Sequence, residues 1–184
     1  MNDRVERLRR KLEEPLLVSD PANIRYLSGL VSSNAALLVD PDRVQLFTDY
    51  RYAESARAIE GVEFVEAKRD LYQTLSELLS GRIGFEGTSL TYERYARLHA
   101  GGVDAVARYG LVEELRVVKD EDELDAIRRA AEIASIAFER FADEGHLVGR
   151  TEAELAWRFE QYPHDASAHG VSFPVQVASG PTAA

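Results

Sequence analysis

The chain has 184 residues, of which 45% are hydrophobic, and its 22 Lys and Arg stand against 32 Asp and Glu, a formal net charge of −10. The hydrophobic fraction suffices for a packed core and argues against global disorder. The acidic balance argues against a nucleic-acid or anionic-membrane surface, and the absence of cysteine excludes disulfides and thiolate metal sites.

The first residues, MNDRVERLRRKLEE, are charged from the third position onward and lack the apolar core of a signal peptide. No apolar run approaches the roughly 18 residues that a membrane-spanning helix needs. We therefore expect a soluble, cytoplasmic protein that has neither a membrane segment nor a nucleic-acid partner.

Strand-like and helix-like patterns alternate over the first 110 residues. In chain order, we expect a helix at 3–14, a strand at 15–20, a hairpin at 35–49, a helix at 50–60, a strand at 62–67, a helix at 70–79, a strand at 82–87, a helix at 90–100 and a strand at 103–109. Pro41-Asp42 joins the hairpin strands and makes that pair antiparallel. The alternation therefore predicts an α/β domain in which helices flank a mixed sheet.

The composition changes near Leu115, and from 120 to 144 nine acidic residues stand against three arginines. Apolar residues spaced by three and four predict one long amphipathic helix at 121–143. The stripe consists of Leu124, Ile127, Ala131, Ala134, Phe138 and Phe141. The acids at 120–123 complement the dipole at the start of this helix. The boundary falls at about 112–119, which predicts domains at 1–115 and 116–184.

A second helix is expected to follow in the C-terminal part. Thr151 and Glu154 have the spacing of a capping box, which opens this helix, and Pro163 is expected to end it. An apolar, strand-like run then covers 173–178 before the turn residues Ser179-Gly180-Pro181.

Residues that could carry chemistry do not form a known local motif. The four histidines are His99, His146, His164 and His169. None has the His-Glu-x-x-His spacing of a zincin, and no Gly-x-Ser-x-Gly nucleophile turn or phosphate-binding glycine loop occurs. Taken alone, these residues therefore predict no self-sufficient active site.

Five stretches, in order, resemble the creatinase/prolidase N-terminal domain followed by the start of the pita-bread peptidase domain. They are Asn23–Gly29 (NIRYLSG), Leu46–Tyr52 (LFTDYRY), Ile83–Glu86 (IGFE), Leu115–Leu124 (LRVVKDEDEL) with Ile127–Ala131 (IRRAA), and Phe173–Ala184 (FPVQVASGPTAA). The first is similar to an NxxYLxG signature, and the last to the first strand of the pita-bread domain. The resemblance implies a ribonuclease H-like mixed sheet flanked by helices, followed by an incomplete pita-bread α+β domain.

The resemblance also implies an activity, that of an Xaa-Pro aminopeptidase or Xaa-Pro dipeptidase (prolidase), a metallopeptidase that hydrolyses the peptide bond before proline. Such an enzyme uses two divalent metal ions, manganese or cobalt. Its substrates are proline-containing peptides. The family's metal ligands would lie beyond Ala184. We therefore expect the N-terminal, non-catalytic part of a longer enzyme, truncated before its active site and inactive by itself.

Two parts of the chain match positions that the family uses near substrate. The aromatic residue at the start of the last strand, Phe173, would line the substrate pocket, with an ordinary core position as the alternative. The loop at Ser32, Ser33 and Asn34 would reach the partner subunit's active site in a homodimer, with a plain surface loop as the alternative. The segment Gln161–His169 departs from the family pattern.

Two other functions remain open at the level of sequence. One is a creatinase-like amidinohydrolase, which has the same fold and no metal. The other is a catalytically dead pita-bread module that serves as a binding or scaffold protein. The residues of the catalytic half would distinguish both from a peptidase.

Overall fold

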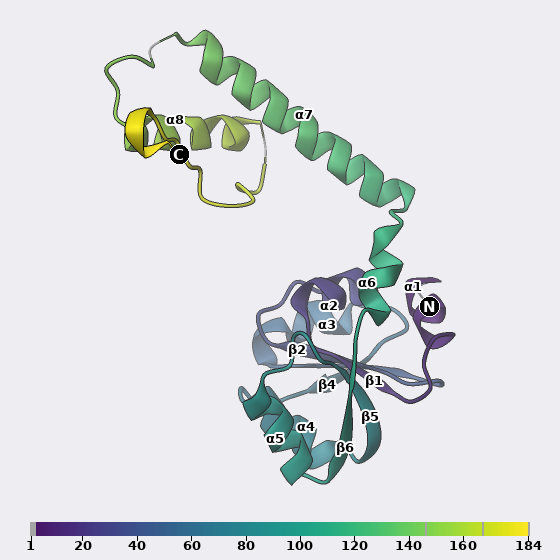
Figure 1. Ribbon diagram of the computed structural model, residues 1–184. Helices are drawn as coiled ribbons and strands as arrows, with labels where there is room; N and C mark the ends of the chain where they lie inside the picture. The colour runs from purple at the N-terminus through teal and green to yellow at the C-terminus, as the bar shows by residue number, and fades with distance from the viewer. Residues whose placement is uncertain (1–2, 146, 167, 184) are drawn as a thin grey trace. The chain divides into compact units, whose positions relative to one another are not determined.

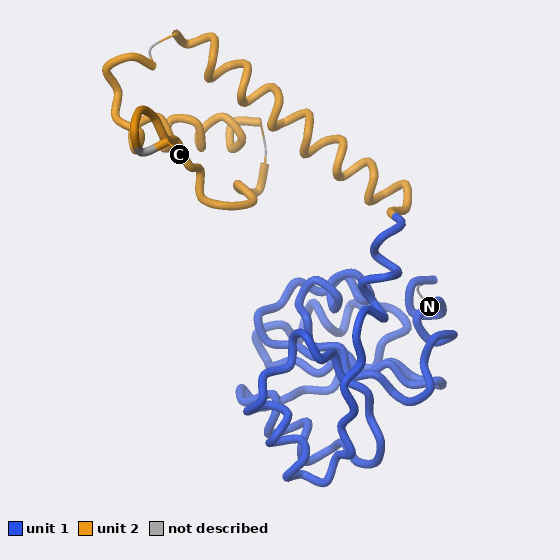
Figure 2. The backbone as a smooth tube through the Cα atoms, in the orientation of Figure 1, with its two compact units in different colours: residues 1–118 blue, residues 119–184 orange. Residues whose placement is uncertain are grey.

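The computed structural model describes residues 3–145, 147–166 and 168–183 (Figure 1). The chain forms two compact units, residues 1–118 and 119–184 (Figure 2). No helix of the described residues is both long and apolar enough to span a membrane. The division into domains at 1–115 and 116–184 stays a prediction about independent folding.

The first unit is built on a six-stranded sheet with the order β4-β3-β2-β1-β5-β6. The strands are β1 (Leu16–Val18), β2 (Ala35–Val39), β3 (Val44–Thr48), β4 (Glu63–Glu66), β5 (Gly81–Glu86) and β6 (Val103–Arg108). β2 is antiparallel to its neighbours β1 and β3, and all other neighbouring pairs are parallel. The predicted mixed sheet is therefore confirmed.

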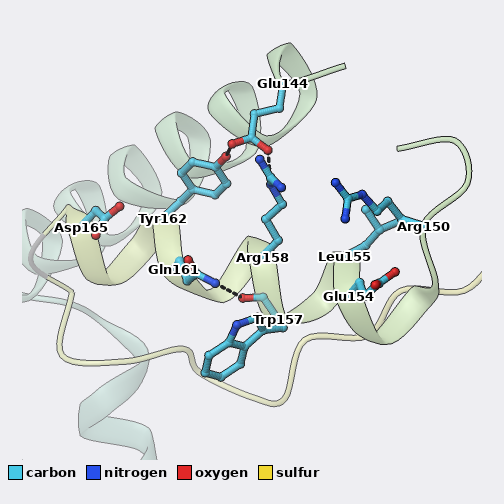
Figure 3. A pocket seen from close by; sticks show the side chains of 9 residues that line it. All are labelled: Glu144, Arg150, Glu154, Leu155, Trp157, Arg158, Gln161, Tyr162 and Asp165. Carbon is cyan, nitrogen blue, oxygen red and sulfur yellow. Dashed lines mark hydrogen bonds and ion pairs between the residues drawn. The ribbon is translucent and has the colours of Figure 1, made fainter. Parts of the chain in front are cut away.

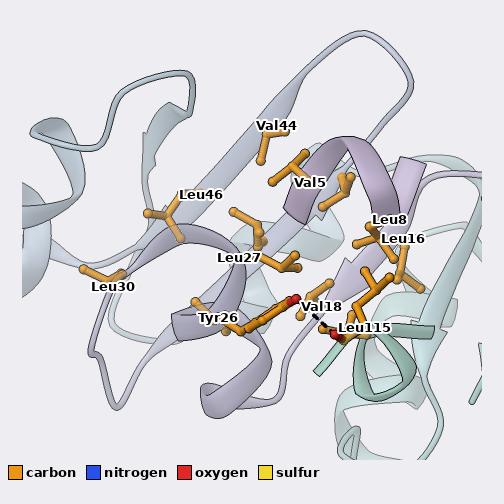
Figure 4. Packing of buried hydrophobic residues seen from close by; sticks show 14 of the residues in the cluster. Val5, Leu8, Leu16, Val18, Tyr26, Leu27, Leu30, Val44, Leu46 and Leu115 are labelled. Carbon is orange, nitrogen blue, oxygen red and sulfur yellow. Dashed lines mark hydrogen bonds between the residues drawn. The ribbon is translucent and has the colours of Figure 1, made fainter. Parts of the chain in front are cut away.

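Helices cover both faces of this sheet. They are α1 (Asp3–Arg9), α2 (Pro21–Ser28), the 3-10 turn η1 (Tyr50–Tyr52), α3 (Ala53–Arg57), α4 (Leu71–Leu78), α5 (Tyr92–Ala100) and α6 (Leu111–Val117). One buried cluster joins residues of α1, α2, α3 and α6 to the sheet (Figure 4), and a second joins α4 and α5 to the opposite face. Figure 1 shows the helices on both faces of the sheet.

Local capping explains where α2 begins and ends. The side chain of Asp20 accepts hydrogen bonds from the backbone N–H groups of Ala22 and Asn23, and Pro21 occupies the first helical turn, where its missing N–H is not needed. Gly29 ends the helix with φ of 79°, a left-handed conformation that favours glycine. The NxxYLxG stretch is therefore a helix with its own stop signal.

The second unit contains α7 (Glu121–Asp143), α8 (Glu152–Asp165) and the 3-10 turn η2 (Gly180–Thr182). Capping boxes open both helices, Asp120 with Glu123 and Thr151 with Glu154. Where the helices pack, the rings of Phe141 and Phe159 meet edge to face, with centroids 5.5 Å apart. The predicted long helix and both predicted helix starts are confirmed.

Two predicted helix ends differ from the structure. α1 ends at Arg9 rather than at 14, because the backbone N–H groups of Lys11 and Leu12 bond three residues back, to Leu8 and Arg9, in tight turns that replace the α-helical pattern. Pro163 lies inside α8, which continues for two more residues, since proline disturbs the preceding turn most.

The predicted strand at 173–178 is wrong for this chain, because residues 173–179 carry no regular secondary structure. A strand needs a neighbour to pair its backbone groups, and the described part of the second unit contains no other strand.

α6 was not predicted from the sequence, and it lies where a domain boundary was expected. Val112 and Leu115 of α6 are buried in the first cluster, and the hydroxyl of Tyr26 donates to the carbonyl of Leu115 (Figure 4).

The apolar stripe of α7 is only partly covered. Ile127 is 52% and Phe138 63% exposed, whereas Ala137, on a neighbouring face, is buried. Phe141, which belongs to the stripe, makes the contact with Phe159 of α8.

Two phenylalanines provide a matched test of where the core lies. Phe47→Ala removes a ring that is 2% exposed in the second cluster, and we expect a loss of about 3–5 kcal/mol in the free energy of unfolding. Phe138→Ala, the control, removes a ring that is 63% exposed and should cost less than about 1 kcal/mol. Urea unfolding followed by circular dichroism measures both, and equal losses would contradict this core assignment.

Candidate functional site

The carboxyl ends of five strands meet at one edge of the sheet. β1, β3, β4, β5 and β6 share one direction, and antiparallel β2 begins at the edge where they end. Open α/β sheets bind ligands in the crevice outside this edge. The loop before β2 and the TDYRY stretch after β3 both lie here, which makes this edge the candidate site.

The predicted loop at Ser32, Ser33 and Asn34 is anchored at this edge. The Ser33 hydroxyl lies 2.9 Å from the hydroxyl of Tyr52, and the Asn34 amide nitrogen donates to Asp49 Oδ2 at 2.7 Å. Within the loop, the Asn34 backbone N–H donates to the Ser32 hydroxyl at 2.9 Å. The loop is thus held by hydrogen bonds to the residues that follow β3, a contact that sequence spacing did not indicate.

Asp49 is the buried centre of this arrangement, with no exposed surface. The Arg51 guanidinium donates to it from Nε at 2.9 Å and from Nη2 at 2.7 Å, and the Arg51 backbone N–H donates at 3.1 Å. These bonds hold the pKa of the Asp49 carboxyl well below its usual range and raise the pKa of Arg51. The aspartate is therefore a fixed anion that orients Arg51, which is 42% exposed.

A second buried carboxylate, Glu86, closes the same edge between β5 and β1. It accepts from the backbone N–H of Ser19 at 2.6 Å, from that of Asp20 at 2.7 Å and from the Asn23 amide at 2.6 Å. Burial raises the pKa of the Glu86 carboxyl, although these donors oppose the shift. Asn23 and Glu86, from two family-like stretches, thus meet as a structural pair.

A hollow of about 480 Å³ lies in the second unit, at α8 (Figure 3). Its lining residues are Glu144, Arg150, Glu154, Leu155, Trp157, Arg158, Gln161, Tyr162 and Asp165. Glu144 accepts hydrogen bonds from Arg158 Nε and from the Tyr162 hydroxyl, so these three polar groups satisfy one another. The lining contains no nucleophile paired with a base, and it indicates no reaction.

The last predicted site residue, Phe173, lies in the segment without regular structure and is 73% exposed. It is therefore not part of a core in this chain. Its role beside a substrate stays a prediction.

The residues present do not fit a two-metal centre. Within residues 3–145, 147–166 and 168–183, no three His, Cys, Asp or Glu side chains are grouped so that they could hold a metal ion. His99 stacks on Tyr95, with centroids 6.1 Å apart and the rings 9° from parallel, and His146 lies outside the described residues.

Comparison with known proteins agrees with the fold. The family model described as the creatinase/prolidase N-terminal domain matches residues 4–118, and that of metallopeptidase family M24 matches residues 125–184. The chain is thus an α/β domain of the creatinase/prolidase type followed by the start of an M24 peptidase domain. It belongs to the creatinase/prolidase family.

Relatives and solved structures carry the names of peptidases. The uncharacterized peptidase YqhT of Bacillus subtilis is 32% identical over 177 residues, 90% of this chain and 48% of that protein. The Xaa-Pro dipeptidase from Bacillus anthracis has a TM-score of 0.85 and 26% identity, covering 93% of this chain and 51% of that one. The N-terminal domain of cytoplasmic peptidase PepQ from Mycobacterium tuberculosis has a TM-score of 0.57 and 30% identity, covering 62% of this chain and 99% of that one.

The chain spans about half the length of the curated relatives it matches, 48% of YqhT and 53% of the Xaa-Pro dipeptidase from Pyrococcus furiosus. The fold class predicted from sequence is confirmed, since the structural neighbours are Xaa-Pro peptidases.

The Asp49–Arg51 pair yields a test with an internal control. Arg51→Ala leaves a buried carboxylate short of two donors, and we expect a loss of about 1–3 kcal/mol in unfolding free energy at pH 7. Arg57→Ala breaks an exposed pair with Glu66, at 3.6 Å, and should cost at most about 1 kcal/mol. Chemical denaturation measures both losses, and an equal loss from the two variants would contradict the role given to Arg51.

The pH dependence of the same variant follows from the lowered pKa of Asp49. A folded-state pKa below the unfolded value of about 3.9 means that the stabilisation is complete above that pH and is lost as the pH falls further. The difference between the original chain and Arg51→Ala should therefore shrink below about pH 4. A difference that stayed constant down to pH 2 would show that Asp49 is not the partner that matters.

Proposed function

We propose that this chain is the N-terminal, non-catalytic part of a metal-dependent Xaa-Pro peptidase that hydrolyses the peptide bond before proline. One observation carries the proposal: the two family models match in succession, 4–118 and then 125–184. The structural likeness to the Xaa-Pro dipeptidase from Bacillus anthracis over 93% of the chain supports it. The substrates would be proline-containing peptides.

In this proposal the metals, manganese or cobalt, are bound by residues that this chain does not contain. The described part of the chain offers no ligand set for them. Its contribution is the α/β domain and the first helices of the peptidase domain, which position groups around a substrate rather than act on the scissile bond.

The loop at Ser32–Asn34 is the part of this chain that we propose contacts substrate, across the interface of a homodimer. Its support is that the loop is held in place: Asn34 donates to the buried Asp49 and also to the carbonyl of Arg69 at 3.2 Å. A held loop loses little conformational entropy when a peptide binds. Phe173, exposed here, would add an apolar contact within its own subunit.

Activity tests the proposal directly. A longer protein that carries this chain should hydrolyse an Xaa-Pro dipeptide, or a peptide with proline at its second position, and should lose that activity on chelation and regain it with manganese. The matched Xaa-Ala peptide is the control. The chain alone should neither cleave these peptides nor retain stoichiometric manganese after dialysis.

Stoichiometric manganese in the purified chain, lost together with activity on chelation, would contradict the assignment of a non-catalytic part. Cleavage of the Xaa-Ala peptide at the same rate would contradict the proposed specificity for proline.

If the loop contacts substrate, a change in the loop should alter KM more than kcat in the longer protein. Asn34→Ala removes the bond to Asp49, and we expect KM for the Xaa-Pro peptide to rise about three- to tenfold while kcat changes less. Gln45→Ala, which removes an exposed hydrogen bond to Glu63, is the control and should change neither constant. Light scattering of the same samples should give twice the subunit mass. An unchanged KM, or a monomer with full activity, would contradict the loop's role.

A further inference from the structure

We propose that a hollow between α4 and α5 binds a small organic oxyanion, a carboxylate or phosphate group carried on a body of about the size of an amino acid. The hollow has a volume of about 350 Å³. Its lining residues, here called the arginine hollow, are Asn34, Arg69, Asp70, Leu71, Tyr72, Glu93, Arg94 and Arg97. This inference concerns the first unit alone and does not depend on peptidase activity.

The arginine hollow lies at the point of the sheet where ligand crevices form. Adjacent strands β3 and β4 end at the same edge, but the chain leaves them toward opposite faces: Ala56 of α3 belongs to one buried cluster and Leu71 of α4 to the other. Such a divergence opens a crevice beyond the strand ends. Arg69 and Asp70 stand in the connection from β4 to α4, directly beside it.

The charges of the hollow favour an anion. Arg97 is paired with Asp70 and Glu93. Arg69 and Arg94 have no carboxylate partner among the described residues, so three arginines face two acids in a chain whose net charge is −10. An anionic ligand would neutralise the excess positive charge of these arginines.

Arg94 lies against the ring of a buried tyrosine. Its guanidinium carbon lies 4.8 Å from the centroid of the Tyr72 ring, and Tyr72 is 6% exposed, so the ring is a fixed support for the planar cation. A planar guanidinium presents paired N–H donors that match the two oxygens of a carboxylate or phosphate. Less side-chain entropy is lost on binding when the donor is already oriented.

Arg69 is positioned from the other side of the hollow. The Asn34 amide nitrogen donates to its backbone carbonyl at 3.2 Å and to the buried Asp49 at 2.7 Å. Arg69 is itself exposed, and its side chain can turn toward a ligand that Arg94 already holds. The two arginines therefore approach the hollow from the connection after β4 and from α5.

The volume favours an organic ligand over a bare ion. About 350 Å³ lies within the range of roughly 300–1,000 Å³ that is usual for small-molecule sites. An isolated phosphate would leave much of this space to water, whereas an attached body would contact the side chains of Leu71 and Tyr72 at its wall. The two possible head groups share the same chemistry and are separated by the test.

The test titrates the ¹⁵N-labelled chain with N-acetylalanine, phosphoserine and inorganic phosphate, and with N-acetylalanine methylamide as a neutral probe. We expect saturable shifts of the amide signals of Arg69–Gln73 and Arg94 with N-acetylalanine or phosphoserine, and none with the methylamide. Because phosphoserine carries a carboxylate as well as a phosphate, binding of N-acetylalanine identifies a carboxylate site, and binding of phosphoserine without that of N-acetylalanine identifies a phosphate site. Added salt should weaken binding, because it screens the charges.

Arg94→Ala and Arg69→Ala should each weaken binding about tenfold, the effect of a lost charge-assisted hydrogen bond. Arg25→Ala, which removes an exposed arginine of α2 outside the hollow, is the matched control and should leave binding unchanged. Arg94→Lys keeps the charge without the planar fork and should weaken binding nearly as much as Arg94→Ala. Thermal unfolding checks that Arg69→Ala, a change at an exposed side chain, leaves the fold intact.

Four results would overturn the proposal. They are the absence of shifts with either organic oxyanion at tens of millimolar, equal binding of the neutral methylamide, an equal loss in Arg25→Ala, and binding of inorganic phosphate as tight as that of phosphoserine. Loss of Xaa-Pro hydrolysis in a longer protein would leave the proposal standing, because the titration uses no peptidase activity.

Discussion

Glu86, a residue that is 5% exposed, ends β5, and its buried carboxyl group must find donors where it lies, because an uncompensated buried charge costs several kcal/mol. The donors come from the start of α2, where Ser19 and Asp20 turn their backbone N–H groups toward it. Asn23 adds its amide and also donates to Glu113, while Arg116 donates to the Asn23 carbonyl oxygen at 2.7 Å. One carboxylate thereby connects the sheet to α2 and, through Asn23, to α6.

The same edge of the sheet shows two ways in which charge is handled. Asp49 and Glu86 are buried anions that neighbouring donors fully engage, so they fix the geometry and offer nothing to a ligand. The arginine hollow differs, because Arg69 and Arg94 stand at its rim without a carboxylate partner among the described residues. The hydrogen-bonded carboxylates of Asp49 and Glu86 thus stabilise the framework, whereas the arginines of the hollow can still bind a ligand. Asn34 connects the two systems, since it contacts both Asp49 and the backbone of Arg69.

Sequence patterns predicted the elements whose stability is local. The hairpin, the alternating strands and helices, and the capping box at Thr151 and Glu154 all depend on residues close in the chain. α6 was missed because seven residues are too few to show a helical period, and the burial of Val112 and Leu115 depends on tertiary packing. The loop at Ser32–Asn34 could be suggested by family resemblance. Its contacts with Asp49 and Tyr52, and the meeting of Arg69 with Arg94, depend on how the strands and helices assemble, which spacing does not encode.

The difference between local and tertiary stabilisation also explains why the predicted strand at 173–178 is wrong. It explains as well why the second unit consists of helices with little core. Among its described residues only Ala137 and Pro163 are buried, while Trp157 is 68% and Phe138 63% exposed. A unit with so small a core gains little from apolar burial, and isolated helices owe most of their stability to tertiary packing. α7 and α8 must therefore rely on their capping boxes and on the contact between Phe141 and Phe159. A strand has no such local resource, because its backbone groups are satisfied only by a neighbour, so the helices of this unit form while the apolar run at 173–178 stays unpaired.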